Sequence, residues 1–185
     1  MLVDAKVAFV PIGVPLSLVA AAGVDIVSPL VYDFLGSGVG TPVNNIYGNP
    51  ALPGQADAMG VGPQRPELVV LIGTALVANT GTPLLTVELQ AAPDNGANLE
   101  GTYQTLVRSG PVTVAQGVAG ARIARFPWVP PFPVNLRPRF MRLNFEIPAG
   151  TNFSAGTIQY AGVTTTPDDL YQLQAARNYT ALGVG

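Results

Sequence analysis

The chain contains no histidine and no cysteine, and Lys6 is its only lysine. Without histidine there is no imidazole base, no Ser-His-Asp triad and no His-ligated metal. Without cysteine there is no thiol nucleophile, no disulfide and no iron–sulfur cluster. These absences exclude the commonest catalytic and metal centres, so we expect a protein that is not an enzyme and needs no cofactor.

Charge is also scarce. Charged residues make up 11% of the 185 residues, against about a quarter in an ordinary soluble domain. The formal net charge is −2, whereas a nucleic-acid-binding protein needs a positive surplus to neutralise phosphates. Hydrophobic residues make up 48% of the chain, which is enough to fill a core and argues against disorder. This excess of apolar side chains over charge predicts burial in an assembly and no binding of nucleic acid.

The most apolar stretch, residues 7–35, lacks the roughly 18 uninterrupted apolar residues of a membrane span, so we expect no membrane contact. Lys6 followed by the apolar run 7–22 resembles a secretory signal peptide. However, Asp4 precedes that run, and Pro11 and Pro15 interrupt it. We therefore favour a structured or partner-bound N-terminal arm over a signal peptide.

Glycine and proline, 21 and 18 in number, divide the chain into three parts. Residues 1–66 are rich in both and predict a long irregular arm of extended chain and turns. Residues 67–165 predict short antiparallel strands, and residues 166–185 predict a short helix beginning near Pro167, followed by a tail. The expected strands are Glu67–Val77, Leu84–Gln90, Tyr103–Val107, Pro111–Ala115, Ala121–Phe126, Arg139–Ile147 and Thr157–Val163. This pattern indicates an all-β sandwich or barrel.

Two motifs that could carry catalysis have simpler interpretations. The acidic residues are scattered, and a glycosidase needs two carboxylates that converge within about 5–10 Å. The only adjacent pair, Asp168-Asp169, fits the first turn of a helix better. The glycines of Gly36–Gly40 resemble a phosphate-binding loop, but Thr41-Pro42 follows them and the necessary lysine is missing.

Residues 122–142 hold five of the eight arginines and no acidic residue, interleaved with aromatic side chains and prolines. Such a stretch can bind single-stranded nucleic acid by stacking, or it can form a protein–protein hot spot. It can also pack on its own sandwich. The acidic chain with one lysine favours a protein partner. The predicted interface residues are Arg122, Arg125, Phe126, Trp128, Phe132, Arg137 and Arg139.

Five segments between Pro66 and Val163, taken in order, resemble the capsid cement (decoration) proteins of tailed bacteriophages. The first is Leu84–Asp94, in which Thr86-Val87-Glu88-Leu89-Gln90 leads into an aspartate-bearing turn. Leu106–Ser109 and Val118–Ala121 come next, followed by Arg139–Phe145 with an Arg-Phe-Met-Arg-Leu phrase. The last is Gly150–Ile158, which closes the pattern with Gly-Thr-Asn-Phe-Ser-Ala-Gly-Thr.

The resemblance implies a jelly-roll-like β-sandwich on the outer surface of the capsid in the virion, made in the host cytoplasm during assembly. It implies two partners: the major capsid protein, whose subunits it would bridge and stabilise, and itself, as a dimer or trimer. The alternative is a carbohydrate- or host-surface-binding module of a phage particle, with Trp128, Tyr103 and Tyr160 as stacking platforms. If the first 66 residues are an arm, their deletion should leave the sandwich folded but abolish oligomerisation or capsid attachment.

Overall fold

The computed structural model describes residues 3–11, 13–33, 67–97, 99–127 and 138–164. Over these ranges the chain is all-β, with antiparallel strands and no helix, and therefore no helix that could cross a membrane. The strands are β1 (Val3–Val10), β2 (Leu16–Ser17), β3 (Ile26–Val27), β4 (Tyr32–Asp33), β5 (Glu67–Ile72), β6 (Val77–Thr80), β7 (Thr86–Ala92), β8 (Gln104–Arg108), β9 (Arg122–Pro127), β10 (Phe140–Glu146), β11 (Asn152–Ala155) and β12 (Thr157–Thr164). The predicted all-β class is confirmed.

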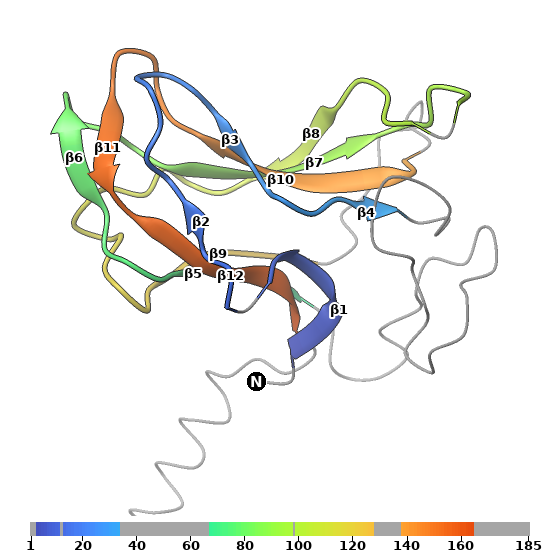
Figure 1. The fold of residues 1–185 in the computed structure, drawn as a ribbon, viewed down its shortest axis with the longest axis horizontal. Helices are drawn as coiled ribbons and strands as arrows, with labels where there is room; N and C mark the ends of the chain where they lie inside the picture. The colour runs from blue at the N-terminus through green and yellow to red at the C-terminus, as the bar shows by residue number, and fades with distance from the viewer. Residues whose placement is uncertain (1–2, 12, 34–66, 98, 128–137, 165–185) are drawn as a thin grey trace, which may run out of the picture.

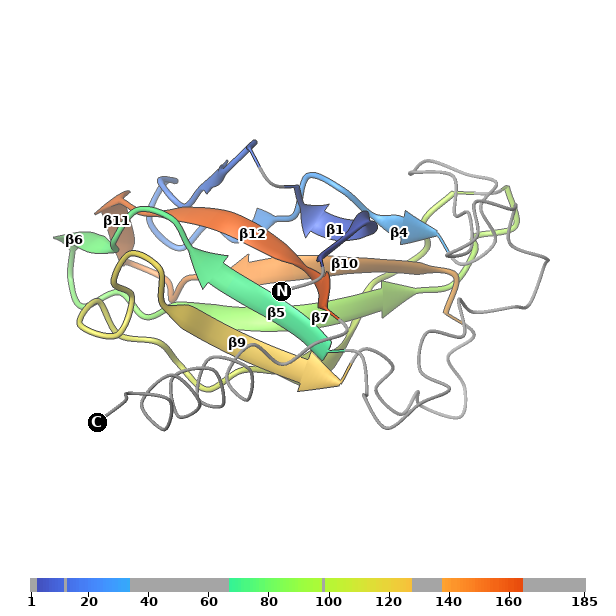
Figure 2. The same cartoon turned by 90° about the horizontal axis from the view of Figure 1, so that it is seen from below.

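Two five-stranded sheets face each other, as in a β-sandwich (Figure 1). Sheet A has the order β1-β12-β5-β9 with β2 also on β12, and sheet B has the order β3-β10-β7-β8 with β4 also on β10. A separate two-stranded sheet, β11-β6, lies at one end of the molecule (Figures 1 and 2).

The core between the sheets is built from alternating apolar side chains. In sheet B, β7 and β10 pair along their whole length, from Phe140↔Ala92 to Glu146↔Thr86. Their inward side chains are completely buried and meet the inward side chains of β5 from sheet A. These residues are Val87, Leu89, Leu143, Phe145, Leu68, Val70 and Ile72. Each such side chain contributes about 1.5–3 kcal/mol when buried.

Nine of the described strands form pairs that are nested one inside another. The first strand, β1, pairs with the last, β12, and β3 and β4 pair with β10. Inside these, β5 pairs with β9, and the innermost pair is β7 with β8. Successive nested pairs therefore alternate between sheet A and sheet B.

The predicted N-terminal arm is not confirmed, because residues 3–33 supply β1 to β4 to the two sheets. Phe9, Val10 and Leu18 are completely or almost completely buried. Gly13 and Gly23, two of the glycines of the expected arm, lie in turns between these short strands, with φ values of 89° and 71°. Residues 34–66 and the helix predicted after Pro167 lie outside the described residues.

Candidate functional site

Strand β9 carries three of the predicted interface residues, but only one of them is well exposed. The Phe126 side chain points into the core and is buried, and Arg122 is partly buried. The Arg125 side chain is 42% exposed and forms an ion pair with Glu67 on the neighbouring strand β5. The structure thus leaves Arg125 as an accessible member of this set. Trp128, Phe132 and Arg137 lie outside the described residues.

Arg139 was also predicted to contact a partner, but its side chain is only 4% exposed and lies inside an ion-pair cluster. Its Nε and Nη2 atoms donate to the two carboxylate oxygens of Asp33, at 3.1 and 3.2 Å. A second ion pair joins it to Asp94. Hydrogen bonding to Asp33 raises the pKa of Arg139, so the guanidinium stays charged despite burial. The cluster joins β4, the start of β10 and the turn after β7, and its role is structural.

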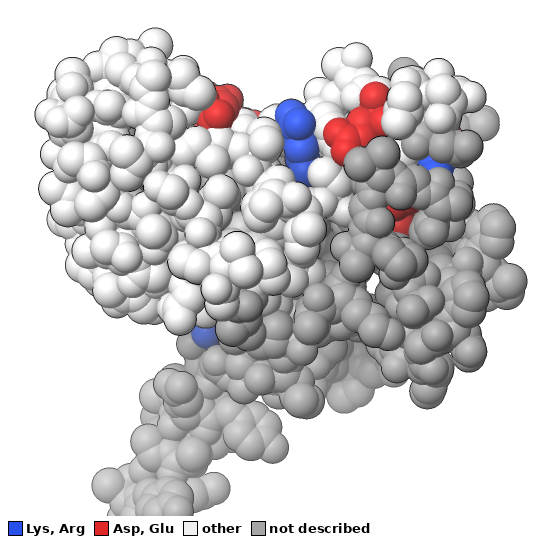
Figure 3. Space-filling model, viewed as in Figure 1, with Lys and Arg blue, Asp and Glu red and all other residues white. Residues whose placement is uncertain are grey.

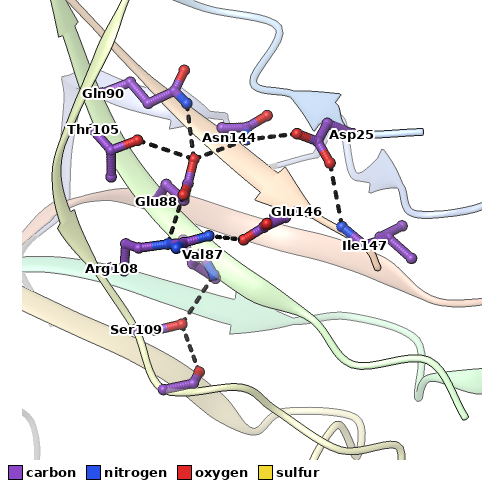
Figure 4. Close-up of polar contacts among 11 residues, drawn as sticks. Asp25, Val87, Glu88, Gln90, Thr105, Arg108, Ser109, Asn144, Glu146 and Ile147 are labelled. Atoms are coloured by element: carbon purple, nitrogen blue, oxygen red, sulfur yellow. Dashed lines mark hydrogen bonds and ion pairs between the residues drawn. The ribbon is translucent and has the colours of Figure 1, made fainter. Parts of the chain in front are cut away.

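A second polar cluster lies on the outer face of sheet B and centres on Glu88 of β7 (Figure 4). Glu88 is only 6% exposed. Its carboxylate accepts hydrogen bonds from Gln90 at 2.8 Å, Asn144 at 3.0 Å and Thr105 at 3.3 Å. Arg108 completes the set with a 2.7 Å ion pair. Donors from β7, β8 and β10 therefore converge on one carboxylate.

Further polar contacts extend the Glu88 cluster across the strands of sheet B. The Asn144 amide also donates to Asp25, at 3.1 Å, and thereby ties the segment before β3 to the sheet. Arg108 of β8 also forms an ion pair with Glu146 of β10. Polar residues thus connect β7, β8, β10 and the segment before β3.

Arg142 extends the polar surface towards β8. Its Nε donates to Gln90 at 3.0 Å, and its guanidinium lies 3.8 Å from the centre of the Tyr103 ring. Burial is the main reason why the pKa of Tyr103 is raised, and neighbouring Glu100 adds to it. Tyr103 is therefore a neutral ring covered by a cation.

The hollow on the outer side of sheet B contains charged atoms between two raised lobes (Figure 3). Among the described residues, no group of three or more His, Cys, Asp or Glu side chains could hold a metal ion. The sequence contains a signal for the Glu88 cluster, since the polar positions of two alternating strands become neighbours once β7 and β10 are paired. The cluster was missed because strand pairing is a tertiary property.

Replacing Glu88 by alanine is expected to destabilise the fold by about 3 kcal/mol, because several buried donors lose their shared acceptor. Glu146→Ala is the control: its side chain is 38% exposed, and the expected loss is below about 1 kcal/mol. Urea unfolding followed by tryptophan fluorescence or circular dichroism measures both. Equal losses would show that the Glu88 cluster is no more important than a surface ion pair.

Among the described residues, the segments that build the end of the sandwich around β6 and β11 contain no charged residue. Four segments build it, 13–24, 73–83, 110–121 and 148–159, and none contains Lys, Arg, Asp or Glu. Backbone hydrogen bonds join them, from Leu18 to Gly156 at 2.9 Å and from Leu76 to Gly117 at 2.8 Å. We call these four segments the uncharged end. In Figure 3 the lobe over β6 and β11 accordingly lacks the charge colours of the neighbouring hollow.

The uncharged end also exposes apolar side chains. Its well-exposed valines, each between 47% and 62% exposed, are Val14, Val19, Val24, Val77 and Val118. Single exposed apolar residues are ordinary, but a group on one charge-free end is typical of an interaction surface.

The aromatic residues considered for sugar stacking are not arranged as a platform. Tyr160 is 2% exposed, and its hydroxyl donates to the backbone carbonyl of Val163 at 3.2 Å. One face of Tyr103 is covered by Arg142. Trp128 lies outside the described residues.

A scan of the sequence against protein-family models finds no match, and a search among curated proteins finds none either.

Proposed function

We propose that this chain is a structural protein of a bacteriophage particle, a jelly-roll cement protein that sits on the outside of the head and bridges major capsid protein subunits. The nested strand pairing carries the proposal. A jelly roll is a long antiparallel hairpin wrapped into two facing sheets, so that the first strand pairs with the last and successive pairs alternate between sheets. The pairs β1–β12, β3/β4–β10, β5–β9 and β7–β8 follow this order. Jelly rolls recur in viral capsid proteins and lectins.

The segments that resemble phage cement proteins form adjoining parts of this fold, which gives further support. Leu84–Asp94 contains β7 and Arg139–Phe145 contains most of β10, and the two strands are paired in full register. Gly150–Ile158 contains β11 and the start of β12. The similarities therefore coincide with a continuous structural unit rather than with unrelated turns.

The surface chemistry also suits a protein that works by docking. A cement protein binds the shell through several weak contacts per copy, and linking these contacts raises its overall affinity well above that of any single contact. The uncharged end and the exposed Arg125 on β9 offer two separate surfaces for such contacts. We assign the β9 side to the head and treat the uncharged end below.

A carbohydrate-binding module is the second candidate, since lectins also use jelly rolls. It needs exposed aromatic rings beside polar groups. Tyr160 is buried and Tyr103 is covered by Arg142, so two of its three platforms give it no support. We therefore favour the cement function over carbohydrate binding.

The cement function predicts that purified phage particles contain this chain in a fixed ratio to the shell protein. Heads assembled without it are expected to release DNA at a lower temperature, because fewer contacts resist the internal pressure. Mass spectrometry of particles and a DNA-release assay on heating measure the two effects, and adding back the purified chain is the control. Equal heat resistance with and without the chain would contradict the proposal.

A further inference from the structure

Strand β6 has an open edge. All four of its residues are exposed, and one edge pairs with β11. The far side of β11 is held by the segment before β3, through hydrogen bonds from Asn152 to the Ala20 carbonyl at 3.1 Å and from Gly23 to the Thr151 carbonyl at 3.0 Å. Among the described strands, none pairs with the other edge of β6. Its outward backbone groups are therefore available to another chain.

Two other outermost strands of the sandwich, β8 and β9, carry residues that usually protect edges. Proteins prevent unwanted edge pairing with charged side chains or proline. The charged side chains of these two strands are Arg108 in β8 and Arg122 and Arg125 in β9. Strand β6, with the sequence Val-Ala-Asn-Thr, contains neither a charge nor a proline. Its edge therefore lacks the charges that β8 and β9 carry, and at four residues it is longer than the uncharged two-residue strands β2 and β3.

We propose that a second copy of this chain docks on the uncharged end, with the two β6 strands side by side and antiparallel across a twofold axis. In a twofold contact the same patch meets itself, so a charge near the axis would face an identical charge. Like charges directly opposite each other destabilise a strand pair. A surface from which all four charged residue types are missing is what self-docking through β6 requires.

The chemistry favours a second copy over a different protein. Most protein surfaces carry charges, and burying an unpaired charge against the uncharged end is costly. The uncharged end of another copy brings no charge to bury, and it offers exposed Val77 and Val118 for apolar contact. This inference does not depend on the cement function, because it concerns the isolated protein.

Sedimentation equilibrium of the purified full chain, over a range of concentrations, tests the proposal. The wild-type chain should form dimers or larger multiples of dimers. The variants Val77→Asp and Val77→Lys should each raise the dissociation constant of that contact by about 100-fold or more, because each buries like charges near the axis. An equimolar mixture of the two variants should recover much of the association, because the axis brings the two copies of position 77 close together.

Leu99→Asp is the matched control. Leu99 is 47% exposed, close to the 48% of Val77, but it lies in the turn after β7, away from β6. This variant should keep the wild-type association, and thermal melts should show all three variants folded. A wild-type chain that stays monomeric overturns the proposal, even if it binds phage heads. Association that persists in both Val77 variants, or that is not recovered in their mixture, overturns it as well.

Discussion

A chain that lacks residues 1–33 is expected not to fold. The deletion removes β1 to β4, and with them the buried side chains of Phe9, Val10, Leu18 and Tyr32. At about 1.5–3 kcal/mol each, these four side chains account for roughly 6–12 kcal/mol of apolar burial. That is comparable to the whole stability of a typical domain, about 5–15 kcal/mol. The deletion also takes β1 from β12 and both β3 and β4 from β10.

Circular dichroism and binding of an apolar dye measure this outcome. The shortened chain should lack a cooperative thermal transition and should bind the dye. Two point variants in the same segment form a matched pair that does not depend on the deletion. Phe9→Ala should cost about 3–5 kcal/mol, whereas Val14→Ala, at a side chain 62% exposed, should stay within about 0.5 kcal/mol. A folded deletion chain, or equal effects of the two point variants, would show that the segment is a dispensable arm.

Arg139→Leu is expected to destabilise the protein by about 3–5 kcal/mol, because it leaves the buried carboxylate of Asp33 without its ion-pair partner. Asp33 is 1% exposed and Arg139 is 4% exposed, so water replaces little of the lost interaction. For a chain of this size the loss corresponds to a decrease in melting temperature of about 6–20 °C. Differential scanning calorimetry measures it directly.

Two controls separate the buried cluster from arginine in general. Arg125→Ala removes an exposed ion pair with Glu67 and should cost less than about 1 kcal/mol. The double variant Asp33→Leu with Arg139→Met should recover most of the loss, because no unpaired buried charge remains at Asp33 and Asp94 is 31% exposed. If Arg139→Leu behaved like Arg125→Ala, the cluster would not stabilise the fold.

The strands of the central sheets could be predicted because their side chains alternate. Leu84–Gln90 and Arg139–Ile147 correspond to β7 and β10, and the apolar run from Glu67 corresponds to β5, in which four of the six residues are buried. These patterns depend on neighbouring residues alone. Pro111–Ala115 was predicted as a strand by the same reasoning, but the described structure has only an isolated bridge there, between Leu85 and Val112.

The N-terminal strands could not be predicted in this way. β2, β3 and β4 contain two residues each, which is too short for any periodicity. Their strand geometry comes from pairing with β10 and β12, more than a hundred residues later in the chain. Glycine and proline at the joints between them are equally typical of an arm and of closely spaced turns.

Composition and strand alternation are local properties, so they were enough to predict an all-β protein that is poor in charge and lacks histidine and thiol chemistry. Which charged side chains lie on the surface depends on the folded arrangement of the strands. That arrangement buried Arg139 against Asp33, gathered donors from three strands around Glu88, and left Arg125 exposed. It also gathered four uncharged segments at one end, beside the open edge of β6. The reason is physical: burial and pairing depend on which strands become neighbours, and nested pairing joins residues that are far apart in the chain.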